Sequence, residues 1–235
     1  MTNADGLREL AEAEEPRAGM QTAGSLGGVL RPGGADVTEV LLIRHGQMPA
    51  TNDTRSDEPL TELGLRQADV LGRFLASKPL HGLYASPAYR AIQTAEGIAR
   101  HSGLEVQVID DLREMETYIP EGVDWEALRQ SDEYKAMNDR FQMERRWEAY
   151  GDLRESGASI RKRITAAVDE LVPKHKGQRI ALVTHGPVIS CYLAAILDSP
   201  YDSIASTQLT GVTTILAADD RRRILNVNSR AHFGV

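Results

Sequence analysis

The chain of 235 residues is poor in cysteine, in aromatic residues and in basic residues relative to acidic ones. Its single cysteine, Cys191, excludes an internal disulfide and a multi-cysteine zinc site. Three Phe, two Trp and seven Tyr are too few for a base-stacking groove. No run approaches the roughly 18 apolar residues that span a bilayer. Basic residues are outnumbered 27 to 34, which gives a net charge of −7. We therefore expect no nucleic-acid partner and no membrane partner.

The N-terminal stretch also lacks what a targeting segment needs. It has no apolar core of a secretory signal, and it is too acidic for a transit peptide. We therefore expect a cytoplasmic protein. Residues 1–37 contain six acidic and three basic residues and little apolar surface to offset the entropy of ordering them. They are predicted to form a flexible N-terminal extension before a domain over residues 38–235.

Within that domain, short apolar runs alternate with amphipathic segments. Strands are predicted at 40–43, 83–85, 106–109 and 180–183, with an edge hairpin from 213–217 and 224–227. Helices are predicted at 62–77, 87–101, 125–150, 160–171 and 187–197, the second starting with Ser86 as N-cap and Pro87 as first residue. This alternation favours an α/β fold. We expect a three-layer αβα sandwich whose mostly parallel sheet has an antiparallel edge strand, with residues 115–156 as a helical cap insertion.

Unusual chemistry follows three of the predicted strands. Arg44-His45-Gly46 follows the first, Ser86 with Arg90 one helical turn later follows the second, and Thr184-His185-Gly186 follows the last. Parallel sheets bind ligands at the carboxyl ends of their strands. Two histidines and two arginines are therefore expected to meet at one edge of the sheet.

Five segments together resemble the signatures of the histidine phosphatase superfamily, which has the phosphoglycerate mutase-like fold. They are LLIRHGQ (41–47), PLTELGLRQA (59–68), YASPAYRAIQTAEGIA (84–99), LREM (112–115) and ALVTHGPVI (181–189). The resemblance covers about residues 38–235 apart from 116–154. It implies a metal-independent phosphomonoesterase that works through a phosphohistidine.

The resemblance also implies a role for each matching residue. His45 is the expected nucleophile, since a neutral imidazole accepts a phosphoryl group near pH 7. Arg44 and Arg90 are expected to clamp the phosphoryl oxygens, and His185 to donate to one of them. Glu114 is the expected acid. Further substrate contacts are expected from four residues, Gly46, Gln47, Asn52 and Gly186.

An alternative to Glu114 lies nearby. Glu116 is a second carboxyl two residues further on, and only one of the two is expected to reach the leaving oxygen at about 3 Å. No metal and no other cofactor is expected, because two arginines and a second histidine supply the electrostatic stabilisation that a metal ion supplies in other phosphoryl transfer enzymes.

Departures from the family pattern favour its phosphatase branch. The mutases carry a Trp-Asn pair after Arg-His-Gly, whereas this chain has MPATND (48–53). Phosphoglycerate mutase-type transfer remains an alternative, as does a phospho-ligand or phosphoprotein binding module without turnover. The expected partner is a small phosphorylated substrate, and a homodimer is possible. One or two of the basic residues in 115–156 are candidates to face an acidic substrate, among Arg129, Lys135, Arg140, Arg145 and Arg146.

Overall fold

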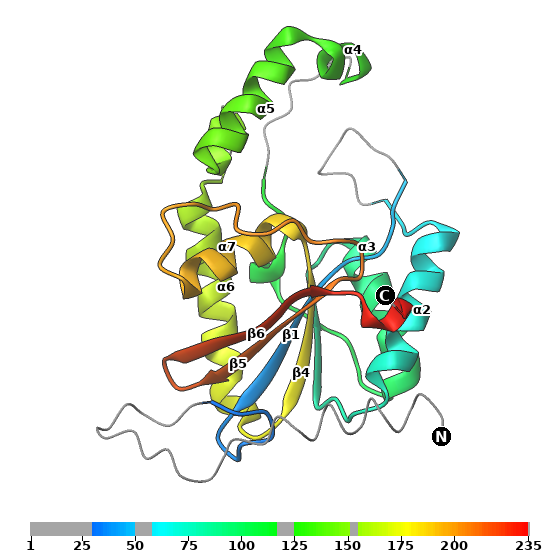
Figure 1. The fold of residues 1–235 in the computed structure, drawn as a ribbon. Helices are drawn as coiled ribbons and strands as arrows, with labels where there is room; N and C mark the ends of the chain where they lie inside the picture. The colour runs from blue at the N-terminus through cyan, green and yellow to red at the C-terminus, as the bar shows by residue number, and fades with distance from the viewer. Residues whose placement is uncertain (1–29, 50–57, 117–124, 151–154, 235) are drawn as a thin grey trace, which may run out of the picture.

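The computed structural model describes residues 30–49, 58–116, 125–150 and 155–234, and its centre is a six-stranded sheet (Figure 1). The strand order is β3-β2-β4-β1-β5-β6. The strands span β1 Thr38–Arg44, β2 Gly82–Ala85, β3 Gln107–Val108, β4 Arg179–Thr184, β5 Val212–Ala218 and β6 Arg221–Ser229. The first four run parallel, so their carboxyl ends share one edge of the sheet.

Helices cover both faces of this sheet. Helices α2 (Glu62–Leu75) and α3 (Tyr89–Ser102) lie on one face, and α6 (Gly157–Leu171) and α7 (Gly186–Ile196) on the other (Figure 1). Side chains of β1 alternate between the two, since Leu41 and Ile43 pack toward α2 and α3 while Val40 and Leu42 pack toward α6 and α7. The predicted three-layer α/β sandwich is confirmed.

The antiparallel part of the sheet differs from the prediction in one respect. The hairpin forms as expected, but its antiparallel strand β5 pairs with β1 inside the sheet, and β6 is the outer strand. All seven residues of β5 are buried, because β1 and β6 flank it and both sheet faces are covered. The apolar sequence of β5 indicated a buried strand but not its neighbour.

The start of α3 is a correction. Ser86 and Pro87 do not begin the helix, which starts at Tyr89 with Ala88 as its N-cap. The Ser86 hydroxyl accepts from the Ala88 N–H at 3.3 Å and is buried beside His185. The sequence pattern assigned the Ser86 side chain to capping α3, but in the structure it contacts His185 instead.

Residues 125–150 form an arm that projects from the body of the molecule (Figure 1). We use "arm" for α4 (Trp125–Gln130), α5 (Asp132–Glu144) and the short 3₁₀ helix η2 (Trp147–Tyr150). The helical stretch predicted from Trp125 to Tyr150 is divided into these three pieces. Ser131 separates α4 from α5 and caps α5 by accepting from the Tyr134 N–H, and α5 ends before Arg145. Three further 3₁₀ turns are η1 Asp110–Leu112, η3 Val172–His175 and η4 Ala231–Phe233.

The segment before β1 contacts the sheet. Leu30 is buried in a small cluster with Leu216 and Ala218, and its carbonyl accepts from Arg223. This part of the expected extension therefore packs on the domain, while residues 1–29 lie outside the described residues. Among the described residues, no helix has the length and apolar character needed to cross a bilayer.

Candidate active site

The carboxyl ends of the parallel strands surround an open pocket of about 300 Å³, which we call the strand-end pocket. This volume is at the small end of the range for small-molecule sites. Its lining residues come from β1 and the turn after it, from α3, from the segment after η1 and from the turn before β5: Arg44, His45, Gln47, Met48, Arg90, Glu114 and Leu209. The topology therefore brings residues from distant parts of the sequence together as expected.

His45 lies directly after β1 and is 4% exposed. Its Nδ1 atom lies 2.8 Å from the Gly46 carbonyl oxygen. A carbonyl can only accept, so the hydrogen is on Nδ1, and Nε2 keeps its lone pair. Burial, reinforced by the neighbouring His185 ring, lowers the pKa of His45 to about 3. The imidazole is therefore neutral at pH 7, in the tautomer that a nucleophile requires.

Gly46 has a packing role that the sequence analysis did not predict. Its N–H donates to the Thr94 hydroxyl at 2.9 Å and so already has a partner. A Cβ at Gly46 would lie 2.9 Å from the Gly64 carbonyl oxygen, and one at Gly64 would lie 2.0 Å from the Gln47 carbonyl oxygen. The two glycines thus permit backbone contact between the end of β1 and the first turn of α2. This packing role is additional to the expected phosphoryl contact of Gly46, which stays a prediction.

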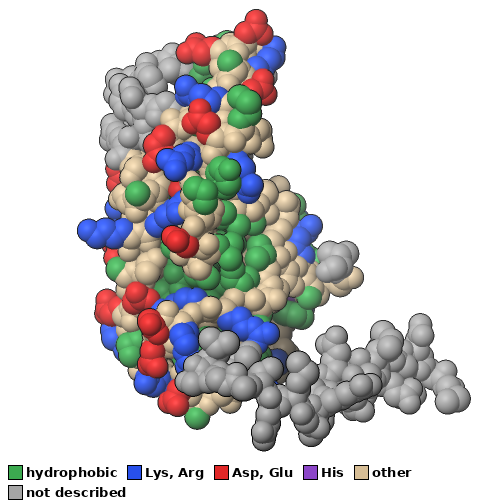
Figure 2. Space-filling view, turned by 60° about the vertical axis from the view of Figure 1, so that its left-hand side comes forward, with side chains coloured by type: hydrophobic (Ala, Val, Ile, Leu, Met, Phe, Trp, Pro, Cys, Tyr) green, Lys and Arg blue, Asp and Glu red, His purple; other side chains and the backbone are tan. Residues whose placement is uncertain are grey.

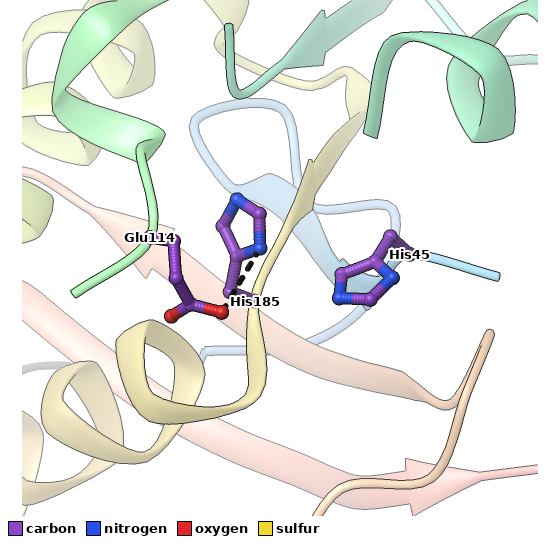
Figure 3. A group of neighbouring side chains, drawn as sticks. All are labelled: His45, Glu114 and His185. Atoms are coloured by element: carbon purple, nitrogen blue, oxygen red, sulfur yellow. Dashed lines mark ion pairs between the residues drawn. The ribbon is translucent and has the colours of Figure 1, made fainter. Parts of the chain in front are cut away.

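His185 is fully buried between two polar partners. Its Nε2 atom lies 2.8 Å from the Ser86 hydroxyl, and its Nδ1 atom lies 3.2 Å from a Glu114 carboxylate oxygen (Figure 3). The ring centroids of His185 and His45 are 5.2 Å apart. Burial lowers the pKa of His185 although Glu114 opposes this. Both ring nitrogens thus face protein groups, and the expected donation to a phosphoryl oxygen requires Nδ1–H to turn from Glu114 toward the ligand.

Glu114 reaches the pocket because the segment before it is fixed. The Thr184 hydroxyl donates to the Leu112 carbonyl at 2.7 Å, and Arg163 donates to the Asp111 carbonyl at 2.7 Å. These bonds tie η1 to β4 and α6.

The Glu114 carboxylate lies 3.8 Å from the Arg90 guanidinium. Burial alone would raise the pKa of Glu114, but His185, the Met115 N–H and Arg90 outweigh it and lower that pKa to about 2. Glu114 is therefore ionised in the unliganded site. The other candidate, Glu116, is exposed and lies 3.7 Å from Arg113, outside the pocket.

Arg44 and Arg90 bring two guanidinium groups to the strand-end pocket. Arg90 is 4% exposed on the first turn of α3. Arg44 donates from Nη1 to the Thr207 carbonyl at 2.6 Å, and its buried Nε has no hydrogen-bond partner among the described residues. A Cβ at Gly186 would approach this Nε to 3.7 Å and the Thr207 hydroxyl to 3.2 Å. Gly186, the first residue of α7, thus lies beside Arg44.

Two expected substrate contacts remain, Gln47 and Asn52. Gln47 lines the strand-end pocket, but its side-chain oxygen accepts from the Thr61 hydroxyl at 2.7 Å and its N–H donates to the Gln67 side chain. It links β1 to the start of α2. Asn52 lies outside the described residues.

Three side chains in the site have the atoms to hold a cation. The ligand atoms of His45, Glu114 and His185 lie within 4.8 Å of one another. The sequence analysis expected these three residues in one site, as nucleophile, acid and second histidine, but not as a set of metal ligands. Arg44 and Arg90 line the same pocket and repel a cation, so the charge of the site favours an anion.

Comparison with known proteins agrees with this geometry. Residues 40–230 match the model of the histidine phosphatase superfamily, branch 1. The chain belongs to this superfamily. Its residues 44–46, 90 and 184–186, which the sequence analysis singled out, all lie inside the matched region.

Among curated members of the superfamily, a probable phosphoglycerate mutase GpmB from Yersinia enterocolitica is 32% identical over 169 residues, which are 69% of this chain and 76% of the relative. Bacillus stearothermophilus YhfR is 29% identical with a TM-score of 0.71, over 83% of this chain and 98% of YhfR. A mycobacterial glucosyl-3-phosphoglycerate phosphatase shares the fold at 21% identity and a TM-score of 0.71, over 82% and 99% of the two chains. The superfamily and these neighbours support a phosphatase or mutase enzyme.

Two further side chains contact the site, Ser86 and Thr207, and the sequence analysis gave neither of them a role there. Ser86 holds Nε2 of His185, and it follows a parallel strand, which was the available signal. Thr207 accepts from Arg44 through its carbonyl and has a buried hydroxyl without a partner among the described residues. It lies in an irregular segment after α7, where no periodicity pointed to it.

Proposed function

We propose that this protein is a metal-independent phosphomonoesterase that acts through a phosphohistidine at His45 on a small phosphorylated metabolite. The observation that carries the proposal is the Nδ1 contact of His45 with the Gly46 carbonyl, which leaves Nε2 as a neutral nucleophile. Arg44 and Arg90 line the same pocket and match the charge of a phosphoryl group. The proposed site residues are His45, Glu114, His185, Arg44 and Arg90, and the proposed location is the cytoplasm.

The reaction has two balanced steps. In the first, Nε2 of His45 attacks phosphorus, the P–N bond forms, and the P–O bond to the alcohol breaks. The protonated carboxyl of Glu114 gives its proton to the leaving oxygen. In the second, water attacks phosphorus, the P–N bond breaks, and Glu114 takes a proton from the water. Inorganic phosphate leaves, and both residues return to their starting states.

Glu114 must become protonated for the first step, although its pKa in the unliganded site is about 2. A bound phosphoryl dianion supplies the change in two ways. Its charge disfavours a second anion nearby, and it draws Arg90 and His185 toward its own oxygens and away from Glu114. When His185 moves away from Glu114 in this way, its Nδ1–H can donate to a phosphoryl oxygen, where negative charge builds in the transition state.

The proposal is tested by rapid-quench experiments with labelled p-nitrophenyl phosphate. We expect turnover that survives a chelator, and an acid-labile, base-stable adduct on residue 45 in single turnovers. A chelator that abolishes activity would overturn the metal-independent reaction, and the His45, Glu114 and His185 cluster would then be the candidate metal site. Absence of any adduct, together with an active His45→Ala variant, would remove the nucleophile assignment.

A mutase is the second candidate, favoured by the name of the Yersinia relative. Addition of a bisphosphorylated primer with a phosphoglycerate substrate should yield isomerised product only if the protein is a mutase. A binding module without turnover is the third candidate. It has no use for the neutral nucleophile and the carboxylate, and the aryl phosphate assay separates it from both enzymes.

A further inference from the structure

Glu155 and Arg163 form a buried ion pair that takes no part in the two steps of the proposed reaction. Glu155 is 6% exposed and Arg163 is 7% exposed, and neither lines the strand-end pocket. The contact is bidentate, because Nε and Nη2 of Arg163 donate to the two carboxylate oxygens of Glu155 at 2.7 and 2.9 Å. Burial would raise the pKa of Glu155, but the hydrogen bonds and the charge of Arg163 outweigh it and lower that pKa. Since a buried ion pair is weak evidence for stability, its role has to be sought in what else it contacts.

The remaining N–H groups of Arg163 are directed at the backbone of the segment that carries the proposed acid. Nη1 donates to the Asp111 carbonyl at 2.7 Å, and Nη2 reaches the Glu114 carbonyl at 3.4 Å. One planar guanidinium thus spans the Glu155 carboxylate and two carbonyls of the acid segment, a geometry that suits its fork of donors. Glu155 fixes the plane of the guanidinium, and the guanidinium fixes the backbone of Glu114.

This contact lies where the chain leaves the body for the arm and returns from it. Glu114 follows η1 by two positions, and Glu155 lies two positions before the start of α6. Figures 1 and 2 show that the arm projects from the body, with a hollow between the two. Arg113 and Glu155 approach to 3.6 Å, so the outgoing and the returning stem of the arm meet at the ion pair. A displacement of either stem at this point would move the Glu114 carboxylate.

The basic side chains of the arm have other contacts. They donate to backbone carbonyls or pair with a neighbouring carboxylate: Arg140 to Ala149, Arg145 to Ser203, Arg146 to Pro200 and Lys135 to Asp132. The side chain of Arg129 lies outside the described ones. These contacts leave the support of Glu114 to side chains of the body.

We propose that Glu155 and Arg163 are positioning residues for Glu114, and that their ion pair holds the acid segment where the carboxyl reaches the leaving oxygen. The inference rests on the proposed phosphatase function and adds to it two residues that touch neither the substrate nor the reacting atoms. A misplacement of about 1 Å costs a catalytic group on the order of 10²-fold in rate. The loss should therefore fall on the step that needs the acid.

The test replaces the whole pair, Arg163→Met together with Glu155→Gln, so that no unpaired charge stays buried. We expect kcat on ethyl phosphate, whose leaving group needs an acid, to fall roughly 10²-fold with little change in KM. Turnover of p-nitrophenyl phosphate should fall much less, because its leaving oxygen scarcely needs a proton. Equal losses on the two esters would overturn the proposal, because a general loss of folded enzyme affects both alike.

The same replacement in a Glu114→Gln protein shows whether the pair acts through the acid. Once the Glu114 carboxyl is gone, loss of the pair should add no further decrease on ethyl phosphate. A decrease in this background as large as in the unaltered protein would show that the pair acts on another group and would overturn the proposal.

A second ion pair on the same helix provides the matched control. Arg161 lies two positions before Arg163 on α6, and its Nη2 is 2.6 Å from the carboxylate of Asp202, which is 5% exposed. Asp202 also accepts from the Trp147 N–H at the base of the arm, at 3.2 Å. Arg161→Met together with Asp202→Asn removes a comparable pair away from Glu114 and should cause no selective loss on ethyl phosphate. A selective loss of the same size in this control would contradict the assignment.

A spectroscopic measurement separates this inference from the proposed function. The ¹⁵N NMR signals of His185 report whether the Glu114 carboxylate still lies beside its Nδ1 atom, 3.2 Å away in this structure, and they need no turnover. Glu114→Gln gives the reference shift. If neither ester is hydrolysed, the phosphatase proposal fails, but a His185 shift on replacement of Glu155 and Arg163, absent from the control, would still support the positioning role. An unchanged His185 signal would overturn it.

Discussion

The Nε2 atom of His232 lies 3.0 Å from the hydroxyl oxygen of Thr210. The Thr210 N–H in turn donates to the carbonyl oxygens of Arg44 and His45, at 3.0 and 3.3 Å. Thr210 has a φ of 55°, a strained value for a β-branched residue, and such strain persists only where surrounding contacts hold it. The C-terminal turn η4 thus supports the backbone of the proposed nucleophile.

His232→Ala should therefore reduce activity as well as stability. Loss of the buried hydrogen bond should lower the free energy of unfolding by about 1–3 kcal/mol. A displaced His45 should lower kcat about 10-fold with little change in KM. Steady-state kinetics and urea unfolding check both values. His101→Ala is the control, because His101 pairs with Asp69 on the surface. An unchanged kcat in His232→Ala would show that η4 is only structural.

The tautomer of His45 is directly measurable. We expect ¹⁵N NMR to show a neutral ring with hydrogen on Nδ1 from pH 5 to 8, because burial lowers its pKa to about 3. His45→Asn assigns the signal by its disappearance. A titration near the ordinary value of 6.5 would contradict the geometry of the site.

The same pKa affects stability. Between pH 6.5 and about 3 the unfolded His45 binds a proton that the folded one does not, so stability rises with pH across this window and is lost on acidification. The contribution is a slope of up to about 1.4 kcal/mol per pH unit. Unfolding of His45→Asn, measured from pH 4 to 6.5, should show a slope smaller by that amount. Equal slopes in the two proteins would mean that His45 is solvated.

Glu114→Gln should show a dependence on the leaving group. Turnover of an alkyl phosphate, which needs an acid, should fall by roughly 10²–10⁴-fold, and turnover of p-nitrophenyl phosphate should fall much less. Glu116→Gln is the matched control, since Glu116 is a carboxylate two residues away outside the pocket. A selective loss in Glu116→Gln, or equal losses on both substrates in Glu114→Gln, would place the acid elsewhere.

Truncation distinguishes two parts of the N-terminal extension. The sequence predicts that residues 1–37 form a flexible extension, but Leu30 packs on Leu216 and Ala218. Removal of 1–29 should leave activity and melting temperature unchanged. Removal of 1–36 should cost about 1.5–3 kcal/mol for the buried leucine, which lowers the Tm by several degrees. Calorimetry on both proteins checks this, and identical Tm values would show that Leu30 contributes nothing.

The layers of the fold were predictable because local pattern dictates them. The apolar runs at 40–43 and 180–183 have the composition of strands buried on both faces, and each precedes a histidine. Their meeting at one edge follows from parallel strand direction alone.

Other features depend on contacts between distant segments and carry no local signal. Ser86 looked like a helix cap but is bonded to His185, 99 positions away. At Gly46 a side chain would meet the carbonyl oxygen of Gly64, 18 positions away, and no sequence pattern indicated this contact. Trp147 of the arm packs near α7, with its indole bonded to Cys191, 44 positions away. Such pairings require the three-dimensional arrangement, because no periodicity encodes them.

Arg44 lines the strand-end pocket and also a second pocket between the arm and α7. This shared position constrains how the enzyme can evolve. A substitution of Arg44 that reshapes the second pocket also removes a cation from the strand-end pocket, so the two pockets cannot change independently at this position. Changes at Gln142 or Ser206 carry no such penalty, since neither side chain lines the strand-end pocket. Divergence in substrate among proteins with this arrangement should therefore concentrate in the arm and in the segment after α7, while the end of β1 stays fixed.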